Sequence, residues 1–186
     1  HAIEQLGGLD VLVNNAGIAG PTAPLEQVNP DEWDKVVAVN LTGTYNVTRW
    51  AIPHLKQSPA GVILIMSSMA GRFGYPNRSP YAATKWALVG LAKTLAIELG
   101  PDNIRVNAIL PGCVAGPRID RVFEGRAALT GKPLDQVRDE ALSIQSLKRL
   151  VDPKDIAALC VFLASDAAKS ISGQAIPIDN DTQKST

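Results

Sequence analysis

Tyr81 and Lys85 are the two residues whose types and spacing favour acid–base chemistry. They lie four positions apart in residues 80–99, which have the apolar periodicity of a helix, so their side chains share one helix face. A free tyrosine has a pKa of about 10 and is a poor base near neutrality. One positive charge about 4 Å away supplies roughly 4 kcal/mol at an effective dielectric near 20, enough to lower a tyrosine pKa by about 3 units. The pair is therefore a candidate general acid and base.

The neighbouring elements place a serine near this pair. Residues 61–67 form a short apolar run typical of a strand buried on both faces, and Ser68 follows at its carboxyl end. In open parallel sheets that edge faces the ligand crevice. Ser79 is a good helix N-cap and Pro80 a good first helical residue. Ser68 could then hold the oxygen of a bound molecule whose proton Tyr81 handles. Taken alone, a tyrosine and a lysine at this spacing are more often exposed residues on a helix surface without a catalytic role.

Motifs along the chain resemble, in order, those of the short-chain dehydrogenase/reductase family, of the compact type that includes many 3-oxoacyl reductases. Ser68, Tyr81 and Lys85 fall on the family's serine and Y-x-x-x-K positions. The other segments that carry the resemblance are LDVLVNNAG at 9–17, VNLTG at 39–43, RVNAILPG at 105–112 and SISGQAIPID at 170–179. The resemblance covers nearly the whole chain.

The resemblance implies an α/β fold with a doubly wound parallel sheet of the Rossmann type. Residues 1–8 read as the end of a helix, and no glycine-rich turn of the pyrophosphate-binding kind is found. We therefore expect residues 1–186 to form a single incomplete NAD(P)-binding domain with strands 4 to 7 of the family's seven. Three strands with their helices, roughly 60–80 residues at about 30 per β-α-β unit, would precede it. Residues 115–147 would form a substrate lid.

The resemblance also implies a catalytic set of Asn40, Ser68, Tyr81 and Lys85. Tyr81 would exchange a proton with the oxygen of an alcohol or carbonyl substrate, and Ser68 would hydrogen-bond that oxygen. Lys85 would assist Tyr81 and hold the nicotinamide ribose. Asn40 would kink its helix and relay the proton; from the residues alone, a solvent-facing or back-bonded amide is the plain interpretation. The implied enzyme is an NAD(P)-dependent alcohol dehydrogenase or ketoreductase.

The cofactor would be NAD or NADP, and the residue that distinguishes them is not identified. The implied cofactor-binding residues are Asn14, Ala16, Gly17, Tyr81, Lys85, Pro111, Gly112 and Val114. Without a ligand, Asn14 to Gly17 would be an ordinary asparagine-glycine turn. Gly116 stands where the family usually has a threonine that bonds the nicotinamide carboxamide, which leaves the backbone amide of Val114 for that contact.

Composition limits the class of partner. The 186 residues are 46% hydrophobic and 19% charged, which is typical of a globular domain. Lysine plus arginine equals aspartate plus glutamate at 18 each, so bulk charge favours a small-molecule substrate over nucleic acid.

Cys113 and Cys160 indicate neither a disulfide framework nor a metal site, which favours the cytoplasm. No apolar run approaches the roughly 20 residues that span a membrane. Small residues along 80–99 and the resemblance predict a homodimer or homotetramer.

Five arginines on the expected active-site loop and lid raise the hypothesis of a substrate with a carboxylate or phosphate. They are Arg72, Arg78, Arg118, Arg121 and Arg126. Solvated arginines are the more frequent interpretation.

Two alternatives to the dehydrogenase remain. An epimerase or dehydratase of the related extended type shares Y-x-x-x-K but needs a larger C-terminal region than residues 111–186 provide. The chain could also be a truncated, non-catalytic half-domain that acts only in oligomerisation, with its first strand as an exposed edge. Activity of the isolated chain is therefore doubtful, and cofactor titration separates the enzyme from the half-domain.

Overall fold

The strands form one parallel sheet. The computed structural model describes residues 2–184, and its strands are β1 (Val11–Asn14), β2 (Val62–Met66), β3 (Arg105–Pro111) and β4 (Ala175–Ile178), in the order β1-β2-β3-β4. All neighbouring pairs are parallel, with Val13 opposite Leu64 and Leu64 opposite Asn107. Because parallel strands end at the same edge, the residues that follow them gather there. The predicted α/β fold with a parallel sheet is confirmed.

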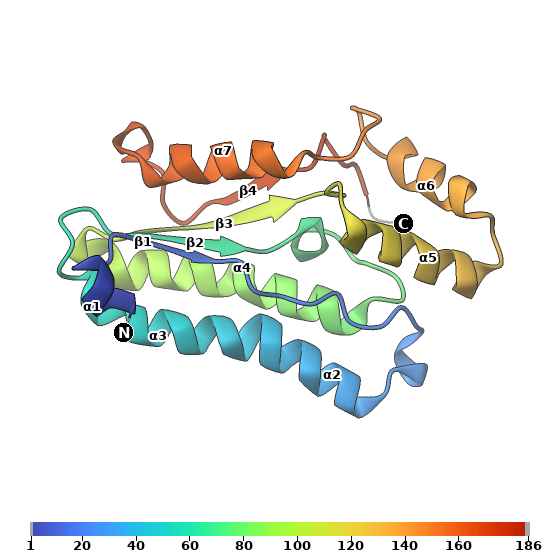
Figure 1. Ribbon diagram of the computed structural model, residues 1–186, viewed down its shortest axis with the longest axis horizontal. Coiled ribbons are helices and arrows are strands. Elements are labelled where there is room, and N and C mark those ends of the chain that lie inside the picture. The colour runs from blue at the N-terminus through green and yellow to red at the C-terminus, as the bar shows by residue number, and fades with distance from the viewer. Residues whose placement is uncertain (1, 185–186) are drawn as a thin grey trace.

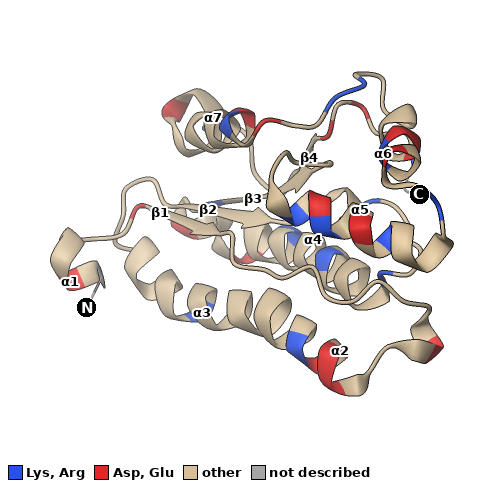
Figure 2. Ribbon diagram, turned by 45° about the vertical axis from the view of Figure 1, so that its right-hand side comes forward, with Lys and Arg blue, Asp and Glu red and all other residues tan. Residues whose placement is uncertain are grey.

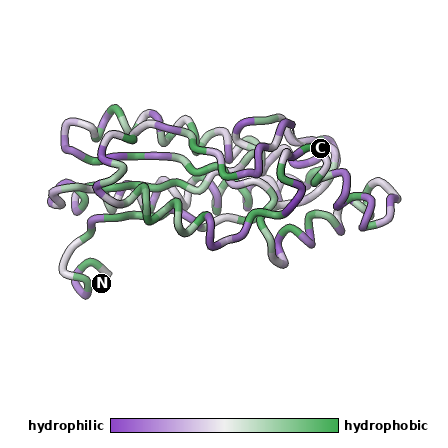
Figure 3. Tube along the Cα trace, turned by 90° about the horizontal axis from the view of Figure 1, so that it is seen from above, coloured by the Kyte–Doolittle hydropathy of each residue, from purple (hydrophilic) through white to green (hydrophobic). Residues whose placement is uncertain are grey.

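Helices cover both faces of this sheet, as Figure 1 shows. One face carries α3 (Gly43–Leu55) and α4 (Ser79–Leu99), with α2 (Pro30–Val37) continuing the line of α3, and the other face carries α7 (Pro153–Ala164). Two helices, α5 (Pro117–Thr130) and α6 (Leu134–Ser143), lie beyond the carboxyl ends of the strands. The short α1 (Ala2–Leu6) lies at the opposite end of the molecule, as Figure 3 also shows.

Charge is distributed unevenly over these helices. In Figure 2, α5 and α6 carry both basic and acidic residues, whereas α3 is almost free of charge. The hydropathy colouring of Figure 3 shows hydrophobic residues interspersed with hydrophilic ones along the helices, as expected for helices with one face on a sheet. None of the described helices is long and apolar enough to cross a membrane.

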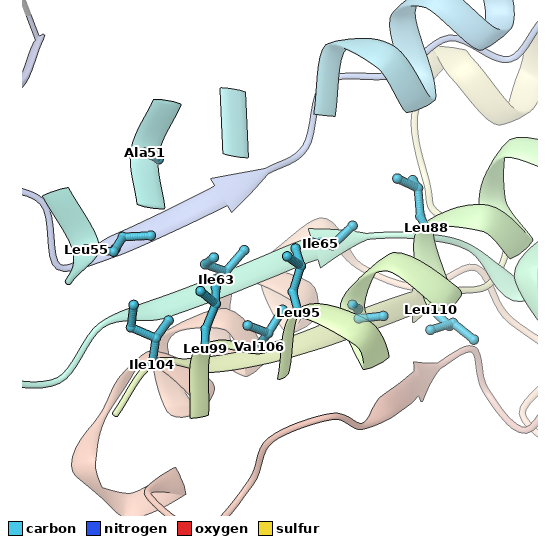
Figure 4. Close-up of a cluster of buried hydrophobic side chains, with 12 residues drawn as sticks. Ala51, Leu55, Ile63, Ile65, Leu88, Leu95, Leu99, Ile104, Val106 and Leu110 are labelled. Carbon is cyan, nitrogen blue, oxygen red and sulfur yellow. The ribbon is translucent and has the colours of Figure 1, made fainter. Parts of the chain in front are cut away.

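The main hydrophobic core lies between the sheet and helices α3 and α4. All five residues of β2 are buried, which confirms the strand predicted from the apolar run. Figure 4 shows Ile63 and Ile65 of β2 among Leu95 and Leu99 of α4, and Leu55 of α3 joins the same cluster. Burying each such side chain contributes roughly 1.5–3 kcal/mol, so this cluster fixes α4 against the strand ends.

One helical segment is interrupted, and one helix cap differs from the sequence prediction. Residues 30–55 do not form one regular helix, because a π-helical turn at Ala38–Thr42 separates α2 from α3. Such single π turns widen the helix locally and re-aim a side chain. Helix α4 begins at Ser79, so the cap position is Arg78, whose side chain makes no capping bond. Pro80 still lies in the first turn, where its missing N–H costs nothing.

Candidate active site

The carboxyl ends of the strands open into a cavity of about 630 Å³. Ser68, Tyr81 and Lys85 all line it, so residues that are distant in sequence meet at one place. Pro111, Gly112 and Val114 line it from the turn after β3. This cavity is large enough for part of a cofactor together with a small substrate.

Ser68 is the second residue after β2 and has an extended backbone, with φ −172° and ψ 165°. Its Oγ accepts a hydrogen bond from the N–H of Ala70 at 3.1 Å, which leaves its own proton available for donation. The preceding Ser67 donates from Oγ to the carbonyl oxygen of Lys85 at 2.7 Å. This bond ties the end of β2 to α4, and it keeps the Ser68 hydroxyl beside the face that carries Tyr81.

Lys85 is a buried cation that faces Tyr81. Its Nζ lies 5.6 Å from the centre of the Tyr81 ring and donates to the carbonyl oxygen of Met66 at 2.7 Å. The side chain is only 4% exposed. Burial lowers the pKa of Lys85 to about 8, and the positive charge of Arg118 acts in the same direction. The ammonium is therefore still mostly protonated at pH 7 and can stabilise negative charge on the phenol oxygen.

Glycines let the chain approach Lys85 closely. A Cβ at Gly71 would collide with Ser67 Oγ and lie 2.7 Å from the carbonyl oxygen of Lys85. A Cβ at Gly17 would lie 3.2 Å from Asn40 Oδ1 and 3.6 Å from Lys85 Nζ. Gly17, which the resemblance implies as a cofactor-binding residue, therefore lies beside the lysine.

Asn40 is fully buried in the π-helical turn, behind the cavity wall. Its Oδ1 accepts from the N–H of Ile18 at 2.7 Å, and its Nδ2 donates to the carbonyl oxygen of Ile18 at 3.1 Å and to Thr84 Oγ1 at 3.2 Å. The plain interpretation of a solvent-facing amide is wrong. Asn40 reaches the site through the loop after β1 and through Thr84, the neighbour of Lys85, and its side chain makes no direct bond to Lys85.

The three residues predicted from the Asn-Asn-Ala-Gly motif lie in different settings. Asn14 is buried and donates from Nδ2 to Thr48 Oγ1 of α3 at 2.9 Å, so its side chain holds β1 to a helix. Ala16 is exposed. Asn15, which belongs to the same motif but is not among the implied cofactor-binding residues, lines the cavity. Neighbouring side chains alternate between the faces of a strand, and this alternation could have identified Asn15.

The turn after β3 has a structural reason for its glycine. A Cβ at Gly112 would lie 2.8 Å from Cα of Asp179, so only glycine fits beside the end of β4. Val114 forms a parallel bridge with Val151 through the carbonyl of Cys113 and the N–H of Ala115. In such a bridge the central residue's own N–H points away from the partner. The amide of Val114 is therefore directed elsewhere, as a contact to a ligand requires.

Two further residues line the cavity: Tyr75, which no sequence feature marks, and Arg78, one of the five arginines of the anion hypothesis. Tyr75 lies with its ring centre 6.4 Å from that of Tyr81, and burial raises the pKa of Tyr75. Arg78 is only 2% exposed, so the solvated interpretation is wrong for this arginine. Arg72, Arg118 and Arg121 are exposed, and Arg118 also lines the cavity. No spacing signal marks Tyr75, because it lies in an irregular loop.

The described residues contain no cluster of His, Cys, Asp and Glu side chains that could hold a metal ion. The polar groups of the cavity wall include the Ser68 hydroxyl, the Tyr81 phenol and the Lys85 ammonium, with the guanidinium groups of Arg78 and Arg118 beside them. Such a set can exchange a proton with an alcohol or carbonyl oxygen and stabilise the charge that develops there.

Comparisons with known proteins agree with this chemistry. The family model described as enoyl-(acyl carrier protein) reductase matches residues 1–180. The 3-oxoacyl-(acyl-carrier-protein) reductase of Thermotoga maritima is 39% identical over 177 residues, which cover 95% of this chain and 67% of that protein. The D-beta-hydroxybutyrate dehydrogenase of Cupriavidus necator is 38% identical over 174 residues, covering 93% and 67%. The chain thus spans about two thirds of the length of these relatives.

Solved structures give the same result. NAD+-bound xylitol dehydrogenase superposes with a TM-score of 0.92 at 31% identity, over 95% of this chain and 70% of that one. The 3-ketoacyl-(acyl-carrier-protein) reductase of Brucella melitensis, complexed with NADH, superposes with a TM-score of 0.83 at 37% identity, over 98% and 70%. These matches extend over the sheet and the cavity alike, and together with the family model they show that the chain belongs to the short-chain dehydrogenase/reductase family.

Proposed function

We propose that the chain carries the catalytic site of an NAD(P)-dependent oxidoreductase that interconverts an alcohol and a carbonyl compound. The observation that carries this proposal is the shared cavity of Ser68, Tyr81 and Lys85, with the Lys85 ammonium beside the Tyr81 ring. Bound nicotinamide would supply or accept the hydride. NAD and NADP remain equal candidates, since the solved relatives carry NAD+, NADH or NADPH.

Each residue of the site has one role in the proposal. Tyr81 gives its phenol proton to the carbonyl oxygen in reduction and takes it back in oxidation. Ser68 donates a hydrogen bond to the same oxygen, and Lys85 stabilises the phenolate electrostatically. Asn40 positions Thr84 and the Ile18 loop next to Lys85, and a proton relay through Asn40 is part of the proposal.

The residues present fit a nicotinamide cofactor. Lys85 Nζ and Gly17 lie side by side, which suits the approach of a ribose to the backbone and the ammonium. Gly17, Ala16, Tyr81 and Lys85 would hold the ribose, and Pro111, Gly112 and Val114 the carboxamide. Asn14 would act by fixing β1, because its side chain is engaged by Thr48. The sheet strands β1 to β4 would correspond to strands 4 to 7 of the family.

Exposed apolar side chains on α3 and α4 support the proposed homodimer or homotetramer. Trp50 is 71% exposed and Ile97 is 79% exposed, with Tyr45, Val47 and Trp86 also exposed on the same two helices. Contact with a second copy of the chain would remove the apolar surface of these side chains from water, which is favourable. A cytoplasmic location is proposed from the two cysteines, which are both free of disulfide bonds.

Tyr81→Phe in the complete natural protein tests the mechanism. We expect kcat/KM for the alcohol to fall by roughly 10²–10⁴, the usual contribution of general acid–base catalysis, while the dissociation constant of the cofactor stays the same. Tyr75→Phe is the matched control, because it removes the same atom from the neighbouring ring and should cost less than tenfold. A Tyr81→Phe enzyme with most of its rate would refute the assignment.

Cofactor titration tests the alternative. Saturable binding of NAD or NADP by the wild-type protein, followed by fluorescence, favours the oxidoreductase. If neither NAD nor NADP binds, the result favours the non-catalytic half-domain. The exposed Val11 and Val13 of β1 would then form its association surface.

A further inference from the structure

A second cavity lies between the loop 17–22 and helix α5. It has a volume of about 320 Å³, and its wall includes Arg78, Arg118 and Arg121. Ala19, Arg78, Arg118 and Val122 line both this cavity and the one that holds Tyr81. A molecule of modest length can therefore occupy both.

The walls of the two cavities carry positively charged side chains and no negatively charged ones. Among the described residues, the linings contain three arginines and Lys85 but no aspartate or glutamate. None of the ion pairs within residues 2–184 includes Arg78, Arg118 or Arg121. Asp120, the acid nearest in sequence, is held by Arg138 of α6 at 2.6 Å. The cationic groups thus have no protein anion as a partner.

Arg78 is the most unusual of these groups, because a buried guanidinium normally has an anionic partner. Its Nη1 donates to Thr22 Oγ1 at 3.1 Å and its Nη2 to the carbonyl oxygen of Ala19 at 2.7 Å, and both acceptors are neutral. Its Nε is buried and has no hydrogen-bond partner. Burying a charge and an unpaired donor is costly, and an anion beside Arg78 would offset that cost.

Helix α5 brings the other two arginines to the same place. A Cβ at Gly125 would lie 3.1 Å from Thr22 Oγ1, so this face of α5 packs closely on the loop. Arg121 lies one turn before Gly125 on the same face, is exposed, and makes no hydrogen bond within residues 2–184. Arg118 donates from Nη1 to the carbonyl oxygen of Gly17 at 3.2 Å. The positive end of the α5 dipole adds to their field.

We propose that the second cavity binds an anionic oxygen group of the substrate, a carboxylate or a phosphate, while the alcohol or carbonyl carbon lies at Ser68 and Tyr81. This inference rests on the proposed function and narrows its substrates to hydroxy acids, oxo acids or their phosphorylated counterparts. Arginine pairs with both groups through two parallel hydrogen bonds, so the donor set suits either.

The test compares charged and neutral substrates in the complete natural protein. Short hydroxy acids are assayed beside their methyl esters, and hydroxyalkyl phosphates beside the corresponding diols, all at saturating cofactor. We expect Arg121→Gln to lower the charged-to-neutral ratio of kcat/KM about fivefold, and Arg118→Gln with Arg121→Gln about thirtyfold. Arg49→Gln, which removes the same charge from the surface of α3, should leave the ratio unchanged.

Three results would overturn the proposal. The first is a wild-type enzyme that prefers the neutral substrates, and the second is an unchanged ratio in the double variant. The third is a rise in the cofactor KM instead, which would assign the arginines to the cofactor phosphates. The preference between the carboxylate and phosphate series identifies the group that is bound.

A binding measurement separates this inference from the proposed function. Calorimetric titration of the hydroxy acids and hydroxyalkyl phosphates into the Tyr81→Phe protein should show binding that Arg121→Gln weakens. Binding of this kind without turnover of any alcohol by the wild type would leave the anion site standing and refute the oxidoreductase. Turnover of neutral alcohols without binding of the anionic compounds would support the oxidoreductase and refute the anion site.

Discussion

Helix α4 and the helices α5 and α6 differ in how much of their surface is buried. Seven residues of α4 are buried, among them Leu88, Leu95 and Lys85, and its apolar side chains join the main core under the sheet. Helices α5 and α6 bury only Val122, Phe123, Val137 and Ala141 and form a separate small cluster with Cys113. Both helices also carry basic and acidic residues, as Figure 2 shows.

This difference separates two requirements of the site. The proposed proton exchange needs Ser68, Tyr81 and Lys85 in one fixed geometry, and the main core holds the elements that carry them. Selection of a substrate needs a wall that can admit and release the molecule, and a weakly packed pair of helices opens at a lower free-energy cost. The arginines proposed to select the substrate lie on α5 and on the loop before α4, at the boundary of the two regions.

Cavity-forming substitutions in the two regions give the largest expected effect. Leu88→Ala should lower the free energy of unfolding by about 4 kcal/mol, because the main core cannot collapse around the hole. Val137→Ala should cost about 1.5 kcal/mol, the transfer value of the lost groups. Urea denaturation measures both. Val137→Ala should also speed the exchange of backbone amide hydrogens in α5 and α6 but not elsewhere. An equal increase in the exchange rates of β2 and β3 would contradict the difference in packing.

The pH dependence of stability tests the burial of Lys85. Its pKa is about 8 in the folded protein and about 10.4 when unfolded, so between these values the unfolded chain binds more protons. The free energy of unfolding therefore rises with pH by about 2 kcal/mol between pH 8 and pH 10 because of Lys85. Below pH 8 this contribution is absent, because Lys85 is then protonated in both states.

Lys85→Met should remove that rise. Lys132→Met is the control in the weakly packed region, because Lys132 forms an exposed ion pair with Glu140. Denaturation at several pH values, taken as the difference between wild type and variant, gives the contribution of each lysine. Identical pH profiles for wild type and Lys85→Met would show that the ammonium is not desolvated.

Two glycine substitutions give the smallest effects, and they should have opposite signs. Gly17→Ala places a methyl group 3.2 Å from Asn40 Oδ1, and three hydrogen bonds hold that amide in place, so the substitution should cost about 1 kcal/mol. Gly125→Ala places one 3.1 Å from Thr22 Oγ1, which is partly buried and accepts a hydrogen bond from Arg78, so this contact offsets part of the helix-propensity gain of about 1 kcal/mol and leaves a smaller net gain. Urea midpoints measure both, and two destabilised proteins would show that the α5 contact is as rigid as the Asn40 contact.

The sequence alone determined the buried strand β2 and the placement of Tyr81 and Lys85 on one helix face, because both depend on local pattern. The apolar run at 61–67 predicts the buried β2, and the spacing of Tyr81 and Lys85 places both on one face of a helix. The position of Ser68 at a strand end is likewise local. The order of the family's motifs added the prediction that these residues meet, and the cavity brings them together.

Only the tertiary structure decided which polar side chains serve the site and which hold the fold. Asn14 bonds to Thr48, Asn40 to Ile18, and Arg78 to Thr22, all between residues at least 22 positions apart. No local pattern encodes such pairings, because a buried polar group takes whichever partner the packed core presents within hydrogen-bond distance. The burial of Arg78 without an anion is of this kind, and it follows from the closing of the loop 17–22 over α4.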